Sequence, residues 1–170
     1  MARFSDKVAL VTGGNSGIGR GIVHRLIDEG ATVAFCGRDP AKGEAVVAEV
    51  AGRQGAGAFY QVDLAQEDAV VDLVARIERR FARLDIVVNN AGVGSRRSGV
   101  EPADTPGQRW DKLRGPNLDA PYFVAAHALP LMARSGKGAI VNISSTATLH
   151  GNWGLYGVAK AGVEALTRAL

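Results

Sequence analysis

The sequence lacks several features that would define other classes of protein. Only one of its 170 residues is a cysteine, Cys36, which excludes an internal disulfide and is typical of a reducing compartment. Its 20 basic and 17 acidic residues are nearly balanced and dispersed, so no nucleic-acid surface is indicated. No run of about 20 apolar residues occurs, and no leader sequence is recognisable. We therefore expect a cytoplasmic protein that acts without a membrane or nucleic acid.

Short apolar runs alternate with longer segments of helical periodicity along the chain. The expected strands cover residues 8–11, 32–36, 58–62, 85–88 and 139–143, and the expected helices cover residues 17–29, 41–51, 67–81, 110–132 and 156–170. Gly115 and Pro116 interrupt the fourth helix, which follows a polar loop over residues 94–107. An apolar content of 46% and 22 glycines fit a globular chain with many tight turns.

This alternation predicts an α/β fold. Apolar strands separated by helices form a parallel sheet that is covered on both faces. Right-handed crossovers then give a three-layer doubly wound sheet, the Rossmann fold, in which ligands bind at the carboxyl ends of the strands. We expect residues 1–170 to form a single dinucleotide-binding domain.

A glycine-rich turn over residues 12–19 joins the first expected strand to the first helix. Gly13 would permit the tight turn, Gly17 would let the backbone approach a pyrophosphate, and Gly19 would let the helix pack closely. The N-terminus of the helix supplies free N–H groups and a partial positive charge for an anion. The turn therefore predicts a phosphate site for a dinucleotide.

Tyr156 and Lys160 form the second informative pair. They are four residues apart in an expected helix, which places both side chains on one face. A free phenol has a pKa near 10, and a neighbouring cation stabilises its phenolate. The pair can therefore exchange a proton with a carbonyl or alcohol oxygen near neutral pH.

Together the motifs at residues 12–19, 89–92 and 156–160 resemble those of the short-chain dehydrogenase/reductase family, and the resemblance covers residues 7–170. It implies hydride transfer between a nicotinamide cofactor and a ketone or secondary alcohol, with Tyr156 as acid/base. The implied catalytic residues are Asn117, Ser145, Tyr156 and Lys160. The implied cofactor-binding residues are Gly13, Asn15, Ser16, Gly17, Ile18, Gly19, Arg38, Asp63, Leu64, Asn90, Ala91, Gly92, Tyr156 and Lys160. The family also implies a homodimer or homotetramer.

The residues after the second expected strand bear on the choice of cofactor. The family usually places an acid at the position of Gly37, where it bonds the ribose hydroxyls of NAD. Glycine removes that acid, and Arg38 can pair with the 2′-phosphate of NADP. Asp39 supports NAD instead, unless it caps the helix that begins near Pro40. We expect NADP, with NAD as the alternative.

Individual roles carry alternatives of their own. Asp63 is implied to meet the adenine, or else to cap the following helix. Ser144 is a less favoured substitute for Ser145, because adjacent strand residues face opposite sides. In the family, Asn117 holds a water that links the lysine to solvent.

Several features depart from the family pattern. The spacing from Ser145 to Tyr156 is shorter than usual, and Pro116 replaces an apolar residue. Relatives continue past Lys160 with further strands and a segment that covers the substrate, so we expect a fold that is incomplete at its C-terminus. Residues 151–154 resemble the branch that acts on 3-oxoacyl and 3-hydroxyacyl groups.

Other readings follow from these departures. The chain could be a nucleotide-binding fragment without turnover, or an interaction protein that uses an exposed sheet edge. Arg96 and Arg97 are candidates for contact with an acidic substrate, although a solvated loop is the favoured interpretation. Trp153 is a candidate for lining the pocket, and plain packing explains it equally well. The three histidines have no cysteine or carboxylate neighbours in sequence, so no metal is proposed.

Overall fold

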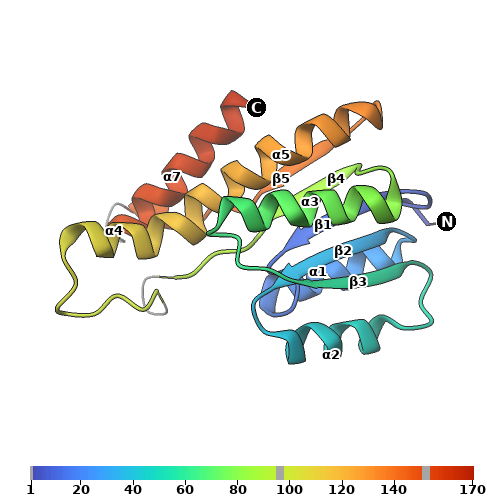
Figure 1. Ribbon diagram of the computed structural model, residues 1–170, viewed down its shortest axis with the longest axis horizontal. Helices are drawn as coiled ribbons and strands as arrows, with labels where there is room; N and C mark the ends of the chain where they lie inside the picture. Colours follow the sequence, from blue (N-terminus) through green and yellow to red (C-terminus); the bar gives the residue numbers. More distant parts are fainter. Residues whose placement is uncertain (1, 95–97, 151–153) are drawn as a thin grey trace.

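The computed structural model describes residues 2–94, 98–150 and 154–170 (Figure 1). Its strands are β1 (Val8–Thr12), β2 (Thr32–Gly37), β3 (Ala56–Gln61), β4 (Ile86–Asn89) and β5 (Ala139–Asn142). Its helices are α1 (Gly17–Asp28), α2 (Pro40–Val50), α3 (Glu67–Phe81), α4 (Pro106–Arg114), the π-helix η2 (Gly115–Asp119), α5 (Ala120–Arg134), α6 (Ala147–His150) and α7 (Gly154–Ala169). Among these, no helix is long and apolar enough to cross a membrane.

The five strands form one parallel sheet in the order β3-β2-β1-β4-β5. Helices α1 and α2 cover one face, and α3 and α5 cover the other (Figure 1). The order reverses next to β1, because β2 lies on one side of it and β4 on the other. The predicted three-layer Rossmann fold is therefore confirmed, and a crevice at the strand ends is expected at this switch point.

The apolar sequence of the strands explains the layers. Successive strand residues point to opposite faces, so Leu10 joins the core under α3 and α5 whereas Val11 joins the core under α1 and α2. All five residues of β1 are buried. Phe35 and Leu73 are among the largest fully buried side chains, one in each core. Burial of such side chains contributes about 1.5–3 kcal/mol each.

The segment after β4 differs from the sequence-based prediction. Helix α4 begins at Pro106 rather than within the predicted helix over 110–132, and Thr105 caps it with Gln108 in a capping box. The predicted interruption is a π-helix rather than a break, so α4, η2 and α5 follow one another directly. A proline has no N–H to donate, and the wider turn of η2 accommodates Pro116. The short helix α6 was not predicted.

Candidate functional site

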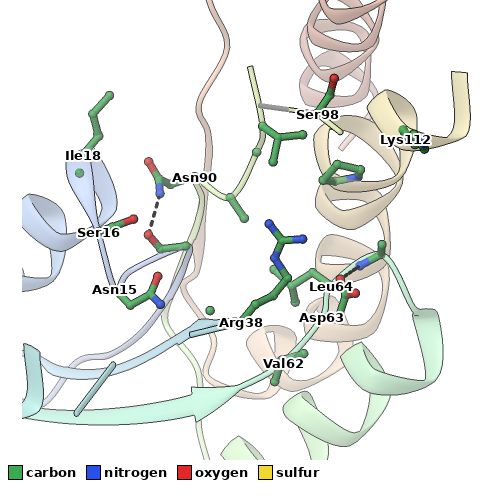
Figure 2. Close-up of a pocket in the computed structure, with 18 of the residues that line it drawn as sticks. Asn15, Ser16, Ile18, Arg38, Val62, Asp63, Leu64, Asn90, Ser98 and Lys112 are labelled. Carbon is green, nitrogen blue, oxygen red and sulfur yellow. Dashed lines mark hydrogen bonds between the residues drawn. The ribbon is translucent and has the colours of Figure 1, made fainter. Parts of the chain in front are cut away.

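A cavity of about 580 Å³ opens at the carboxyl ends of β1, β2, β3 and β4 (Figure 2). Its lining residues are Gly13, Asn15, Ser16, Gly17, Ile18, Gly37, Arg38, Val62, Asp63, Leu64, Ala65, Asn90, Ala91, Gly92, Val93, Ser98, Asp111, Lys112 and Pro116. Most of the residues predicted to contact a cofactor are in this set. Gly19, Tyr156 and Lys160 are not.

The turn between β1 and α1 has the conformation that its glycines permit. Gly13 has φ 63° and Gly17 has φ 52°, both in the left-handed region. A side chain on Gly13 would begin 3.0 Å from the Cα of Ala91. Apart from its chain neighbours and the nearby backbone of α1, no described atom lies within 4 Å of the corresponding point on Gly17. Ser16, the N-cap of α1, makes no side-chain capping bond. The first N–H groups of α1 therefore border open space, as an anion site requires.

Gly19 and Asn90 fasten the turn to the segment after β4. A Cβ on Gly19 would lie 2.2 Å from the carbonyl oxygen of Gly13 and 2.4 Å from Asn90 Nδ2. Asn90 Nδ2 donates to the carbonyl oxygens of Thr12 (2.9 Å) and Gly13 (3.3 Å), the latter drawn in Figure 2. Thr12 Oγ1 in turn accepts from the backbone amides of Asn90 and Ala91. Gly19 thus packs against the turn and Asn90, where the sequence had indicated only close packing of the helix.

Arg38 extends from the end of β2 into the cavity (Figure 2). Within the described part of the chain its guanidinium has no ion-pair partner. Asp39, the alternative ribose ligand, is engaged elsewhere: it accepts from the Lys42 backbone amide at 3.1 Å and pairs with Lys42 Nζ at 3.2 Å. The hydrogen bond from that amide is the main reason why the pKa of Asp39 is lowered. Asp39 therefore caps α2 and does not line the cavity.

Asn15 covers Gly37 at the same rim. A Cβ on Gly37 would lie 2.5 Å from the Cγ, Nδ2 and Oδ1 atoms of Asn15. Asn15 Nδ2 donates to the carbonyl oxygen of Asp39 at 3.1 Å, which holds the amide in that place. Gly37 thus removes an acid from the rim and also makes room for Asn15.

Asp63 and Leu64 follow β3 and lie next to this rim, since the Val62 amide donates to the carbonyl oxygen of Gly37 at 3.1 Å. Asp63 Oδ1 accepts from the backbone amide of Ala65 at 3.2 Å, and Leu64 is buried. The N-cap of α3 is Gln66, so the alternative interpretation of Asp63 as the cap of that helix is wrong. Its carboxylate remains at the cavity wall.

Sequence reasoning missed the wall that α4 and η2 contribute, namely Asp111, Lys112 and Pro116. Lys112 Nζ donates to the Asp104 carboxylate at 2.7 Å and to the carbonyl oxygen of Gly99 at 2.9 Å, so it ties the preceding loop to α4. The sequence-based prediction began this helix later than Pro106, and the residues of this wall belong to no recognised sequence motif.

Asn117 is the best-fixed of the predicted catalytic residues. It is fully buried, its Oδ1 accepts from the Val93 amide at 3.1 Å, and its Nδ2 donates to the carbonyl oxygens of Val93 (3.0 Å) and Leu113 (2.9 Å). A Cβ on Gly92 would lie 2.7 Å from Asn117 Oδ1 and 3.5 Å from Lys160 Nζ. The structure therefore brings Asn117 and Lys160 together beside Gly92, which lines the cavity.

Lys160 and Tyr156 stand on α7, one turn apart. Lys160 is buried, and its Nζ donates to the carbonyl oxygen of Ile143 at 2.9 Å. Burial lowers the pKa of Lys160, because it penalises the charged form. Tyr156 is half-buried, and its hydroxyl makes no hydrogen bond within the described part of the chain.

The two serines after β5 differ in their bonding. Ser145 Oγ accepts from the Ala147 amide at 3.2 Å. Ser144 Oγ donates to Glu164 Oε1 at 2.6 Å, which commits its proton. Of the two, Ser145 keeps a hydroxyl proton to offer a substrate.

Some predicted features lie outside the described residues, namely Arg96, Arg97, Trp153 and most of the stretch over 151–154. The expectation that the histidines have no carboxylate neighbours is wrong for two of them, because helix packing places His24 2.9 Å from Glu49 and His127 2.8 Å from Glu67. In the part that is described, no three His, Cys, Asp or Glu side chains are grouped as a metal site.

Comparison with known proteins decides the family. The sequence profile of the short chain dehydrogenase family matches residues 7–170. The chain belongs to this family. It is 40% identical over 172 residues to the 3beta-hydroxysteroid dehydrogenase of Mediterraneibacter gnavus and 39% identical over 172 residues to the L-fucose dehydrogenase of Rattus norvegicus. Each match covers 100% of this chain and 61% of the relative, so the chain spans less than two thirds of their length.

Solved structures of short-chain dehydrogenases have the same fold. A metagenomic short-chain oxidoreductase in complex with NADP is 34% identical, with a TM-score of 0.86, and the match covers 98% of this chain and 75% of that one. NAD⁺-bound xylitol dehydrogenase is 29% identical, with a TM-score of 0.88 and coverage of 98% and 64%. The chain is therefore a member of an oxidoreductase family that uses NAD(P).

Proposed function

We propose that this short-chain dehydrogenase binds NADP(H) and interconverts a ketone and a secondary alcohol, with Tyr156 as the acid/base. The observation that carries the proposal is the cavity at the strand ends, since most of the residues predicted to contact a cofactor line it. A nucleotide-binding fragment without turnover remains the alternative.

The fit of a dinucleotide rests on the turn and its surroundings. The uncapped N-terminus of α1 would hold the pyrophosphate, because its N–H groups and dipole favour negative charge. The open side of Gly17 leaves room for that contact. Asp63 and Leu64 would hold the adenine end, while Asn90, Ala91 and Gly92 would line the path toward α7.

The preference for NADP rests on Arg38. Its guanidinium points into the cavity without an ion-pair partner in the described part of the chain, and Asp39 is occupied as a helix cap (Figure 2). A guanidinium binds phosphate through charge-assisted hydrogen bonds. With no acid at Gly37, a 2′-phosphate would meet attraction without repulsion.

The chemistry divides between the cofactor and α7. Nicotinamide supplies or accepts the hydride when bound. Tyr156 would donate a proton to the carbonyl oxygen, or remove one from the alcohol, while Lys160 stabilises the phenolate by its charge. Ser145 would hold the substrate oxygen with its free hydroxyl proton. Asn117 would keep the end of the cavity in place beside Lys160 and relay protons through a bound water.

The same proposal extends to the whole protein. A cytoplasmic homodimer or homotetramer would act on a small carbonyl or alcohol. Its relatives are named for a 3beta-hydroxysteroid and for L-fucose, both of which carry secondary hydroxyl groups, and this supports a secondary alcohol here.

Calorimetric titration of the purified chain with NADPH and NADH tests the proposal. Arg38→Ala should weaken NADPH binding by about 1.5–3 kcal/mol, the scale of a hydrogen bond to a charged group, and leave NADH binding unchanged. Arg134→Ala is the matched control, because that arginine pairs with Glu78 between α3 and α5, away from the cavity. Equal losses for both cofactors would rule out the phosphate role, and no binding of either would overturn the proposal.

A further inference from the structure

Glu164 on α7 holds the segment that carries Ser145. Its Oε1 accepts from Ser144 Oγ at 2.6 Å and from Thr148 Oγ1 at 2.9 Å. Ser144 precedes Ser145 directly, whereas Thr148 lies beyond it on α6. One carboxylate oxygen therefore joins both sides of the turn, and we call these three residues the Glu164 clamp.

Ser145 is bound into the same clamp through its backbone. The Thr148 hydroxyl lies 2.9 Å from the carbonyl oxygen of Ser145 as well as from Glu164, so its single proton serves two acceptors. The Thr148 amide also donates to the Ser145 carbonyl at 3.1 Å. The Ser145 hydroxyl itself accepts from Ala147, and no described residue takes its proton. The clamp thus fixes the backbone of Ser145 while leaving its proton available.

The position of Glu164 on α7 relates the clamp to the other catalytic residues. Tyr156, Lys160 and Glu164 are spaced by four residues, which places them along one face of the helix. Lys160 Nζ holds the carbonyl oxygen of Ile143, and Glu164 holds the next residue, Ser144. The face that presents Tyr156 therefore also sets where the segment of Ser145 lies.

The charge of Glu164 suits this task. The hydrogen bond from Ser144, followed by that from Thr148, lowers the pKa of Glu164, so its carboxylate is ionised at neutral pH. Hydrogen bonds to an ionised acceptor are shorter and stronger than neutral ones. A neutral amide at this position would accept the same two bonds more weakly, and an apolar side chain would accept neither.

We propose that Glu164 is a positioning residue, which orients Ser145 toward the substrate oxygen by clamping Ser144 and Thr148. The inference rests on the proposed function.

Steady-state kinetics of Glu164→Ala tests the clamp. The probe is a ketone that the unsubstituted chain reduces with NADPH, chosen from 3-oxosteroids, keto sugars and 3-oxoacyl thioesters. We expect kcat to fall about 10²-fold, the loss that a misplacement of about 1 Å can cause, with the KM for NADPH unchanged. Glu164→Gln keeps an acceptor oxygen and should restore most of the rate. Thr167→Ala is the matched control, since it removes the 2.8 Å bond between Asn142 Nδ2 and Thr167 Oγ1 but spares the clamp.

A double-mutant cycle separates positioning from mere stability. If Glu164 acts through Ser145, adding Glu164→Ala to Ser145→Ala should cause no further loss of kcat. Thr148→Val removes only one donor, so it should give an intermediate loss of kcat that also vanishes in the Ser145→Ala background. This variant replaces Glu164→Ala in the cycle if Glu164→Ala does not fold. A wild-type rate for Glu164→Ala, or additive losses, would overturn this inference alone. A chain that reduces no ketone would overturn the proposed function as well.

Discussion

Replacing Gly37 by aspartate should reverse the proposed preference for NADPH. A carboxylate at this rim can bond the ribose hydroxyls of NADH and repels a 2′-phosphate. Two unit charges about 4 Å apart repel by about 4 kcal/mol at an effective dielectric constant near 20. Salt screens exposed charges, and Gly37 lies at an open rim, so we expect about 2–3 kcal/mol. That corresponds to NADPH binding weakened about 30- to 150-fold.

The structure also indicates what this substitution costs the fold. A Cβ on Gly37 would lie 2.5 Å from three side-chain atoms of Asn15, so the amide must rotate away. Rotation breaks the 3.1 Å bond from Asn15 Nδ2 to the carbonyl oxygen of Asp39, a loss of about 0.5–1.5 kcal/mol. Asn15→Ser breaks the same bond by itself. The two substitutions should therefore be non-additive by about 1 kcal/mol, since the double variant loses that bond only once.

Two measurements check this reasoning. Calorimetry at low and high ionic strength gives the affinities of Gly37→Asp for NADPH and NADH, and the NADPH penalty should shrink as salt rises. Urea unfolding of both single variants and the double variant gives the coupling energy. An unchanged ratio of NADPH to NADH affinity in a folded Gly37→Asp would refute the electrostatic argument. Additive stability losses would show that Asn15 is not the group displaced.

Three further variants test the catalytic pair, the end of the cavity and the base of the sheet. Tyr156→Phe should abolish ketone reduction while NADPH affinity stays the same, and normal turnover would disprove the acid/base role. Gly92→Ala should lower the free energy of unfolding, measured in urea, by about 1–3 kcal/mol. Its Cβ would meet Asn117 Oδ1 at 2.7 Å, and three hydrogen bonds hold that amide in place. An unchanged urea midpoint would mean that the amide moves aside without cost. Burial alone would raise the pKa of Asp85, but the hydrogen bonds from Arg83 and the Val8 amide outweigh burial and lower the pKa. The stability that Asp85 contributes is therefore fully present above its unfolded pKa of about 4, and it is lost as pH falls through the lower folded pKa. Asp85→Asn should reduce the fall in melting temperature between pH 6 and pH 2. An unchanged fall would show that other carboxylates cause it.

Much of the fold follows from local patterns. Strand β1 is buried on both faces, and a continuous apolar run in the sequence predicts such a strand. The glycines of the turn mark its end. Helix α3 has the predicted bounds, Glu67–Phe81, because Val70, Leu73 and Ile77 repeat at helical spacing. The least accurate prediction was the start of α4, where the Thr105 capping box and Pro106 were not recognised as a helix start.

The contacts that organise the site were less predictable, because they join residues far apart in sequence. Nothing local indicates that the Asn117 amide would bond both backbone groups of Val93. The role of Asn15 as a cover for Gly37 likewise depends on how two strand ends meet. In the sequence nothing distinguishes Glu164 from other carboxylates on helices. Its hydrogen bonds arise only because α7 packs against the segment after β5. Sequence identified the residue types, whereas tertiary packing decided their partners.

In the proposed site, cofactor binding and proton transfer would belong to different parts of the structure, and Lys160 would lie where the two meet. The cavity lies over β1 to β4, while Ser145 and Tyr156 depend on α7 and the end of β5. Lys160 Nζ donates to the carbonyl oxygen of Ile143 after β5, and it lies close to Gly92, which lines the cavity, and to Asn117. Any shift of α7 relative to β5 would therefore move Lys160 relative to Ile143 and also relative to Gly92.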